Sequence, residues 1–323
     1  MSILVTGAAG FIGYHLTLKL MSEGHEVIGI DNLNDYYDPA LKKTRLKSLT
    51  EQDHDHKFTF KELDISDEYA LQSLGKGHQF SHIYHLAAQA GVRYSLTNPQ
   101  AYTQSNLVGH VNMLELARHQ KELKHFIYAS SSSIYGDSTT APFQEDRMTE
   151  QPKSLYAATK KSNELLTQSY SHLYGIAATG LRFFTVYGPY GRPDMAPWLF
   201  TDAILAGRPI KVFNQGDLRR DFTYVADIVD GCFRLLNRPP ENSLQSIFNI
   251  GHNQPVQLMT FIETLEHILG LEAEKIMMPM QPGDVYETSA DITKINKHTG
   301  FKPKTSLTEG LTNFVTWFKE YHQ

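Results

Sequence analysis

A tyrosine and a lysine near the middle of the chain are spaced for proton transfer. Tyr156 and Lys160 stand four residues apart in a segment with a helical pattern, so their side chains lie on one face, one turn from each other. A phenol titrates near pH ~10 and is a poor base at neutral pH, but a neighbouring ammonium favours its phenolate form. A run of serines that includes Ser131 precedes the pair. Because 17 of the 323 residues are tyrosines, such a pair also arises by chance, and the motifs around it must decide its meaning.

A glycine-rich turn near the start of the chain is suited to binding phosphate. Gly7, Gly10 and Gly13 follow the first predicted strand and open the first predicted helix, with Phe11 and Ile12 between them. The glycines permit a tight turn and let backbone amides approach a pyrophosphate at the positive end of the helix. The G-x-x-G-x-x-G spacing differs from the usual G-x-G-x-x-G fingerprint. Its strand-turn-helix context nevertheless favours a dinucleotide site over a purely structural turn.

An acidic residue at the end of the second strand indicates which dinucleotide is bound. Asp31, followed by Asn32, can accept hydrogen bonds from the adenosine ribose hydroxyls and would repel a 2′-phosphate. No Lys or Arg occurs among the ten residues after Asp31 to stabilise that phosphate. The sequence therefore predicts NAD rather than NADP.

Two further loops are expected to complete the cofactor site. Asp64 and Ile65 follow the third predicted strand, and Asp64 suits the adenine edge, although an N-cap role for the next helix is an equal alternative. The segment Leu86-Ala87-Ala88-Gln89 follows the fourth predicted strand. Its small side chains would let the backbone lie against the cofactor.

Length and composition limit the classes of function. A chain of 323 residues exceeds the size at which one core usually stops growing, so two lobes are expected. The net charge of −5 gives no electrostatic footprint for nucleic acid or an anionic membrane. No apolar run approaches the ~18–20 residues that a membrane span needs. The first strand begins at Ser2 and leaves no room for a signal sequence, so a cytoplasmic location is expected.

Two features that resemble reactive sites have simpler explanations. Cys232 has apolar neighbours at helical spacing, so a buried core thiol is expected rather than a nucleophile. The Asp53-His54-Asp55-His56 segment has ligand-type residues but lies in a polar stretch between predicted elements. A solvated loop is expected there, and no metal site is predicted.

Short apolar runs alternate with amphipathic ones over the first 182 residues. This alternation predicts an α/β fold: a Rossmann-type, doubly wound parallel sheet with helices on both faces and ligands at the carboxyl ends of the strands. Residues 1–182 are expected to form the NAD-binding domain, with a returning segment near 224–252, and residues 183–323 a smaller C-terminal α/β substrate lobe. The expected strands are Ile3–Thr6, Glu26–Ile30, Phe58–Glu62, His82–His85, His125–Ala129 and Ala177–Phe183. The expected helices are Phe11–Ser22, Asp67–Leu74, Ala101–Gln120, Leu155–Leu173, Trp198–Ala206, Val225–Leu236, Leu258–Leu269 and Leu307–Tyr321.

Taken together, these motifs resemble the extended short-chain dehydrogenase/reductase family over essentially the whole chain. Several longer strings are similar to the UDP-glucuronate 4-epimerases within that family. These strings are Asp31–Asp38, Ala90–Ser95, Ser154–Lys161 and Leu181–Pro189.

The resemblance implies roles for particular residues. Tyr156 would be the catalytic base, Lys160 would bind the nicotinamide ribose and lower the pKa of the tyrosine, and Ser131 would be the catalytic serine. Asn106 would lie near the nicotinamide, and Arg220 would grip the UDP diphosphate. Gln281 stands where related galactose epimerases often carry a second diphosphate-binding arginine, so the phosphate clamp is expected to differ. The remaining residues expected at the sugar-nucleotide site are Ser132, Ser133, Thr185, Arg192 and Phe213.

The same resemblance implies the reaction. An NAD-dependent 4-epimerase would interconvert UDP-glucuronate and UDP-galacturonate through a transient 4-keto sugar with no net redox change. A 4,6-dehydratase needs an acidic pair beside the catalytic serine, where Ser132 and Ser133 stand instead. A UDP-glucuronate decarboxylase and a 4-epimerase of another UDP-sugar (UDP-glucose or a UDP-N-acetyl-uronate) remain alternatives. A non-catalytic NAD-sensing regulator is a remote one.

Relatives of this type form homodimers through two helices, and a homodimer is expected here. The apolar residues that would contribute are Leu107, Val111, Leu114, Leu165, Leu166 and Tyr170.

Overall fold

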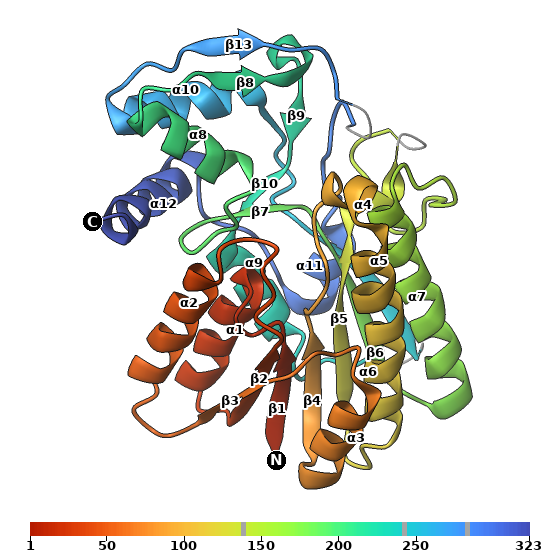
Figure 1. Cartoon of the computed structure of the whole chain (residues 1–323). Helices are drawn as coiled ribbons and strands as arrows, with labels where there is room; N and C mark the ends of the chain where they lie inside the picture. Colours follow the sequence, from red (N-terminus) through yellow and green to blue (C-terminus); the bar gives the residue numbers. More distant parts are fainter. Residues whose placement is uncertain (137–139, 241–243, 282–284) are drawn as a thin grey trace.

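A seven-stranded parallel sheet forms the centre of the larger lobe (Figure 1). The computed structural model describes residues 1–136, 140–240, 244–281 and 285–323. The strand order is β11-β6-β5-β4-β1-β2-β3, and every neighbouring pair is parallel, which confirms the predicted Rossmann-type fold. The strands are β1 (Ser2–Thr6), β2 (Val27–Asp31), β3 (Phe58–Glu62), β4 (Phe80–His85), β5 (His125–Ser131), β6 (Ala178–Phe183) and β11 (Gln245–Ile250).

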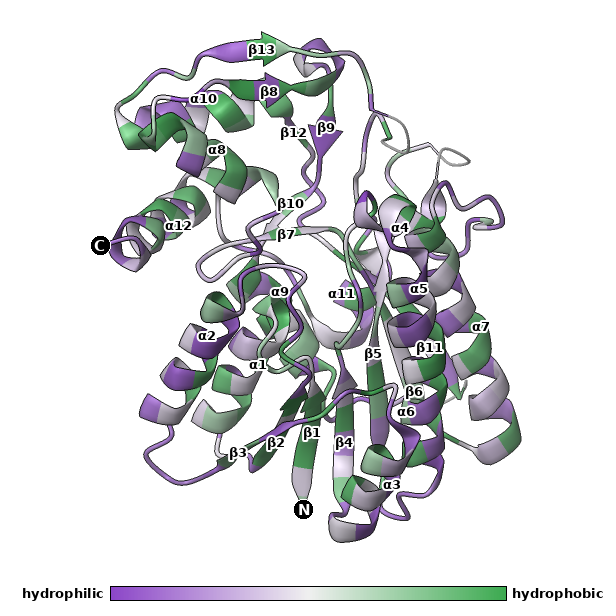
Figure 2. Cartoon of the chain, in the orientation of Figure 1, coloured by the Kyte–Doolittle hydropathy of each residue, from purple (hydrophilic) through white to green (hydrophobic). Residues whose placement is uncertain are grey.

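Helices cover both faces of this sheet. Helix α1 packs between α2 and α9 on one face, and α6 packs between α3 and α7 on the other. Figure 2 shows that these helices carry both hydrophobic and hydrophilic residues. The bounds are α1 (Phe11–Ser22), α2 (Pro39–Glu51), α3 (Glu68–Gly77), α6 (Gly109–Arg118), α7 (Leu155–Tyr174) and α9 (Val225–Arg234).

The helix expected over residues 101–120 is interrupted. The chain forms two short helices, passes through a π-helical turn and only then continues as α6. The π-helical turn carries Asn106. The pieces that precede α6 are α4 (Tyr94–Thr97), α5 (Pro99–Tyr102) and η1 (Thr103–Val108).

The smaller lobe lies above the carboxyl ends of the strands (Figure 1). Its core is built from α8, α10 and α12 with short strand pairs, and α10 packs against both other helices. Segments β7 and β10 connect it to the sheet region. The bounds are β7 (Thr185–Tyr187), α8 (Ala196–Leu205), β8 (Ile210–Val212), β9 (Arg219–Arg220), β10 (Phe222–Tyr224), β12 (Val256–Gln257), α10 (Leu258–Leu269), β13 (Lys275–Met277) and α12 (Leu307–Tyr321). Helix α11 (Thr293–Thr299) returns to the larger lobe and packs against β11.

The predicted core thiol is confirmed. Cys232 is fully buried on α9, and burial raises its pKa to about 12. Along the described residues, no helix is both long enough and apolar enough to cross a bilayer.

Candidate active site

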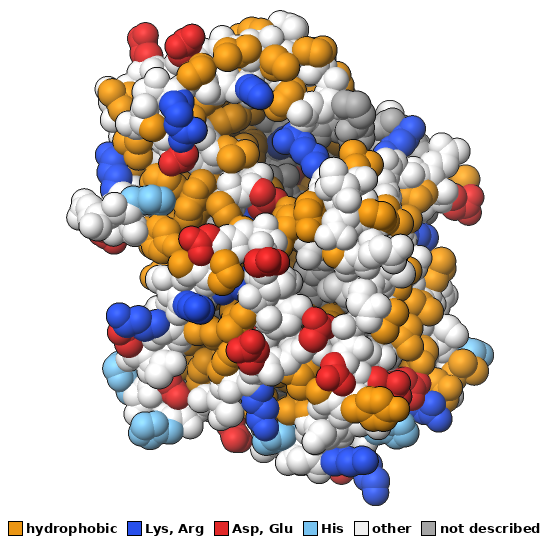
Figure 3. Space-filling view, in the orientation of Figure 1, with side chains coloured by type: hydrophobic (Ala, Val, Ile, Leu, Met, Phe, Trp, Pro, Cys, Tyr) orange, Lys and Arg blue, Asp and Glu red, His pale blue; other side chains and the backbone are white. Residues whose placement is uncertain are grey.

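One cavity runs along the carboxyl ends of β1, β2, β4 and β5, at the point where the strand order reverses between β1 and β4. This is where ligands bind in open parallel sheets. Figure 3 shows the surface hollowed between the two lobes, with Lys or Arg side chains at the edge of the hollow. Predicted residues that line the cavity are Gly7, Gly10, Phe11, Ile12, Gly13, Asp31, Asn32, Ile65, Leu86, Ala87, Ala88, Gln89, Ser131, Tyr156, Lys160 and Arg192.

The glycine turn forms a cradle that larger residues would fill. Gly7 has a φ of +71°, and a Cβ there would lie 2.9 Å from the amide nitrogen of Ala87. A Cβ on Gly13 would lie 2.0 Å from the carbonyl oxygen of Gly7. The turn can therefore close tightly on β4 only with glycine at these positions, and it leaves the amino-terminal end of α1 open to a phosphate. These residues fit the pyrophosphate of a dinucleotide.

The adenosine end of the cavity contains a lysine that the sequence analysis missed. Lys42 lines the cavity beside Asp31, and its Nζ lies 3.4 Å from Asp31 Oδ1. Both side chains are almost fully buried. The absence of Lys and Arg from the ten residues after Asp31 therefore does not leave Asp31 without a neighbouring cation. Lys42 is the eleventh residue after Asp31, one beyond the segment considered, and it belongs to α2, a helix that the sequence analysis did not predict.

Asp64 supports the cofactor site from behind and does not line the cavity. Its Oδ2 accepts a 2.8 Å hydrogen bond from Asn32 Nδ2, and its Oδ1 accepts from the amide and hydroxyl of Ser66. Burial raises the pKa of this carboxyl, but the three donors outweigh that effect and lower it. The alternative N-cap role belongs to Asp67, which accepts from the Ala70 amide at the start of α3.

Asn106 also acts from behind the cavity. Its side-chain amide exchanges two hydrogen bonds with the backbone of Gln89, at 2.8 and 3.0 Å, and donates a third to Thr159. Asn163 in turn bonds to the Asn106 carbonyl, 2.6 Å away. The π-helical turn directs this side chain at the loop after β4. Asn106 therefore fixes Gln89, which lines the cavity, and does not line it itself.

The three predicted catalytic side chains meet at the other end of the cavity. Ser131 ends β5, while Tyr156 and Lys160 project from the first turns of α7. Burial raises the pKa of Tyr156, and the hydroxyl of Ser131 and the charge of Arg192 lower it in part. Burial also lowers the pKa of Lys160 to about 8. In the described structure the ammonium donates one hydrogen bond, to the Ala129 carbonyl at 2.9 Å.

A buried ion pair holds the strand end that carries Ser131. Glu164 on α7 accepts from Arg182 on β6 at 2.8 and 2.9 Å, and from the hydroxyl of Ser130 at 2.7 Å. All three side chains are nearly inaccessible. Ser130 is committed to Glu164, whereas the hydroxyl of Ser131 interacts with Tyr156.

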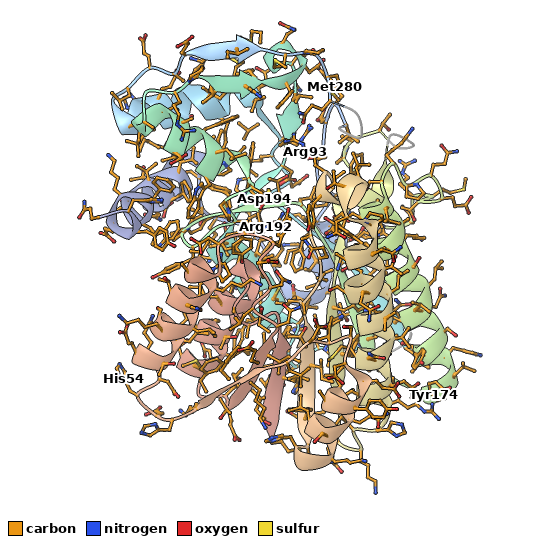
Figure 4. All side chains as sticks on the ribbon, in the orientation of Figure 1. His54, Arg93, Tyr174, Arg192, Asp194 and Met280 are labelled. Atoms are coloured by element: carbon orange, nitrogen blue, oxygen red, sulfur yellow. The ribbon has the colours of Figure 1, made fainter. Side chains whose placement is uncertain are left out.

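A second ion pair lies across the mouth of the cavity, between the lobes (Figure 4). Asp194 receives two hydrogen bonds from the Arg192 guanidinium, at 2.9 and 2.5 Å, and one from the hydroxyl of Tyr36 at 2.9 Å. Burial raises the pKa of Asp194, but Arg192 and Tyr36 lower it by more, so the pKa lies below its usual value. Neither Tyr36 nor Asp194 was predicted, although an acid two residues after a candidate site arginine is a signal that the sequence contains.

The remaining predicted sugar-nucleotide residues do not line this cavity. The Arg93 guanidinium stacks 5.4 Å from the ring centre of Phe213, which joins the two lobes. Arg220 donates to the carbonyls of Arg219 and Tyr286. The side-chain oxygen of Gln281 is buried and has no hydrogen-bond partner among the described residues. Thr185 lies on β7, and Ser132 and Ser133 lie on the turn after β5, the 3-10 helix η2 (Ser132–Tyr135).

The fold and the cavity together define a dinucleotide-dependent enzyme. Comparison with known proteins gives the same result and specifies the family. The chain belongs to the NAD dependent epimerase/dehydratase family, whose model matches residues 3–251, and its cofactor is NAD.

Individual relatives are similar over the full length. A probable UDP-glucuronate 4-epimerase of Rhizobium meliloti is 45% identical, covering 100% of this chain and 98% of that protein. The UDP-glucuronic acid 4-epimerase of Bacillus cereus, solved with UDP-glucuronic acid and NAD, superposes with a TM-score of 0.91 at 35% identity, covering 99% and 100%. The UDP-glucose 4-epimerase of Thermotoga maritima, solved with UDP-glucose, gives 0.89 at 31% identity and full coverage of both chains. These similarities identify the chain as an NAD-dependent isomerase.

Proposed function

We propose that this protein is a UDP-glucuronate 4-epimerase that forms UDP-galacturonate through a 4-keto intermediate. The observation that carries the proposal is the composition of the cavity around Tyr156. Among the described residues that line it, the cations at the end that holds Tyr156 are Lys160 and Arg192, and the one acid, Asp31, lies at the adenosine end. This arrangement suits an anionic sugar. It also lacks the acidic pair that a dehydratase would need to expel a hydroxyl.

The chain's own residues divide the chemistry between them. Tyr156 takes the proton of the sugar C4 hydroxyl, and Ser131 holds the C4 oxygen by a hydrogen bond. When bound, NAD accepts the hydride from C4 and returns it to the opposite face. Because burial raises the pKa of Tyr156, its phenolate needs a nearby positive charge, and Lys160 together with the cofactor's cationic ring would supply it.

A uronic acid carries an additional risk at the ketone stage. The 4-keto intermediate is a β-keto acid, and it loses CO2 when the bond to the carboxylate lines up with the carbonyl π system. The enzyme must therefore hold that carboxylate out of line. Arg192, Thr185 and the serines Ser132 and Ser133 are the residues we assign to this grip, with the diphosphate bound by Arg220 and the uracil near Phe213.

Product analysis with purified protein tests the proposal. UDP-glucuronate should give UDP-galacturonate without net accumulation of NADH. Formation of UDP-xylose would instead establish a decarboxylase, accumulation of NADH a dehydrogenase, and faster turnover of UDP-glucose or a UDP-N-acetyl-uronate a different epimerase. Binding of NAD with no turnover of any of these sugars would support a sensing role.

We also infer a homodimer that uses α7 and the helix segment before β5. On α7, Leu165, Leu173 and Tyr174 are 55%, 63% and 44% exposed, which leaves apolar surface that a second copy of the chain could cover. Leu114, by contrast, is fully buried in its own core and is not available to a partner. Sedimentation at micromolar concentration should give twice the chain mass. A single-chain mass would refute the dimer.

A further inference from the structure

The adenosine end of the cavity holds an ion pair between two residues that almost no solvent reaches. The side chains of Lys42 and Asp31 are 6% and 8% exposed. Lys42 also donates to Asn34 Oδ1, 3.2 Å away, and lies over the ring of Tyr37, 5.5 Å from its centre. A buried ammonium is stable only with a counter-charge, and Asp31 supplies it.

The hydrogen bonds of this pair are one-sided. Lys42 Nζ and the amide of Leu33 both bond to Oδ1 of Asp31, at 3.4 and 2.9 Å. Among the described residues no donor is bonded to Oδ2, although the residue lines the cavity. Lys42 therefore occupies one carboxylate oxygen and leaves the other for ribose hydroxyls.

We propose that Lys42 forms a latent 2′-phosphate site that Asp31 keeps closed, so that this one pair sets the preference for NAD over NADP. With Asp31 present, the ammonium is neutralised and the carboxylate repels a second negative charge. When Asp31 is replaced by a neutral residue, the buried ammonium of Lys42 lacks its acidic partner. A 2′-phosphate then offers the negative charge and the acceptor oxygens that the carboxylate supplied. The inference depends on the dinucleotide site alone, so it stands whichever sugar is the substrate.

The test is a competition between NAD and NADP for the full-length protein, with the bound dinucleotides released by acid and quantified. In Asp31→Asn the ratio of NAD to NADP bound should fall by on the order of 100-fold relative to the wild type. Adding Lys42→Met to that variant should reduce NADP binding by about tenfold. Lys47→Met is the matched control, because Lys47 lies on the same helix and its side chain is 76% exposed. It should leave the ratio unchanged.

A melting experiment gives a readout that does not depend on competition. Without ligand, Asp31→Asn should melt below the wild type, and 2′,5′-ADP should raise its melting temperature more than 5′-ADP does. The wild type should show the opposite order. If Asp31→Asn fails to fold, the Lys42→Met variant tests the proposal by itself. Its ratio of bound NAD to bound NADP should exceed that of the wild type by about tenfold. Equal NADP binding by Asp31→Asn with and without Lys42, or an unchanged ratio in Lys42→Met, would overturn the proposal.

Discussion

The burial of Lys160 destabilises the folded protein, and replacing this residue should make the effect measurable. Burial lowers its pKa from 10.5 to about 8, which corresponds to about 3 kcal/mol of destabilisation at pH 7 in the cofactor-free protein. The folded-state pKa lies below the unfolded-state value, so the unfolded chain binds more protons between pH 8 and 10.5. Stability should therefore rise with pH through that window. About 2 kcal/mol of the penalty should be relieved between pH ~7 and ~9.5.

The Lys160→Met variant removes this titration. It also leaves the Ala129 carbonyl without its donor, at a cost of about 1–3 kcal/mol, so the absolute stability at one pH is not informative. The informative quantity is the change in free energy of unfolding between the two pH values. The wild type should gain about 2 kcal/mol more than Lys160→Met.

Guanidinium unfolding of cofactor-free protein, followed by circular dichroism, measures this difference. Lys161→Met is the control, since Lys161 is the next residue on α7 and its side chain is 27% exposed. It should keep the wild-type pH dependence. If Lys160→Met keeps it as well, Lys160 is not the titrating group and the argument from burial fails.

Three other substitutions test the site and its support. Tyr156→Phe should lower kcat by about 10²–10⁴-fold while NAD and UDP-sugar binding persist, and wild-type turnover would refute the proposed base. Asp194→Asn should raise both KM for UDP-glucuronate and the amount of CO2 released per turnover. UDP-glucose binding should not change, and neither should the Asp202→Asn variant, which removes an exposed ion pair. An unchanged ratio of CO2 release to epimerisation would show that Asp194 does not orient Arg192. Glu164→Gln should destabilise the fold by about 3–5 kcal/mol, because it leaves Arg182 buried without its counter-charge, and a melting curve like that of the wild type would contradict this.

The parallel sheet could be predicted because strands such as β1 and β2 are buried, nearly continuous apolar runs, although β3 is half polar and β11 was not among the expected strands. Several helices could also be predicted from the sequence. Helices α1, α10 and α12 begin and end at the expected residues. Helix α2 was missed for a physical reason. Two of its four buried residues are Lys42 and Arg45, which are stable inside because they pair with Asp31 and with backbone carbonyls. A hydropathy pattern counts such residues as surface.

The parts of the site that could be predicted are those whose geometry or chemistry admits one residue type. Glycines in a tight turn, and a tyrosine one helical turn from a lysine, are of this kind. Roles that depend on the partner of a side chain were not predictable. Asn106 could be assigned to the nicotinamide, but the π-helical turn places its amide on the backbone of Gln89. The Tyr36–Asp194 contact joins residues 158 positions apart, and no local pattern marks it.

The two buried lysines of the cavity differ in how their charge is compensated, and the difference explains how the site binds its cofactor. Lys42 has an acidic partner within the protein, so its charge is neutralised before any ligand arrives. Lys160 has a carbonyl oxygen as its hydrogen-bond partner in the described structure, and its lowered pKa records the missing compensation. Ribose hydroxyls that accept from Lys160 would restore part of that energy. On the proposals made above, this penalty becomes binding energy for NAD at the reacting end, while the adenosine end selects between dinucleotides. The proposed epimerase would borrow and return one hydride, so it needs its cofactor to stay bound, and the uncompensated charge of Lys160 would favour that retention.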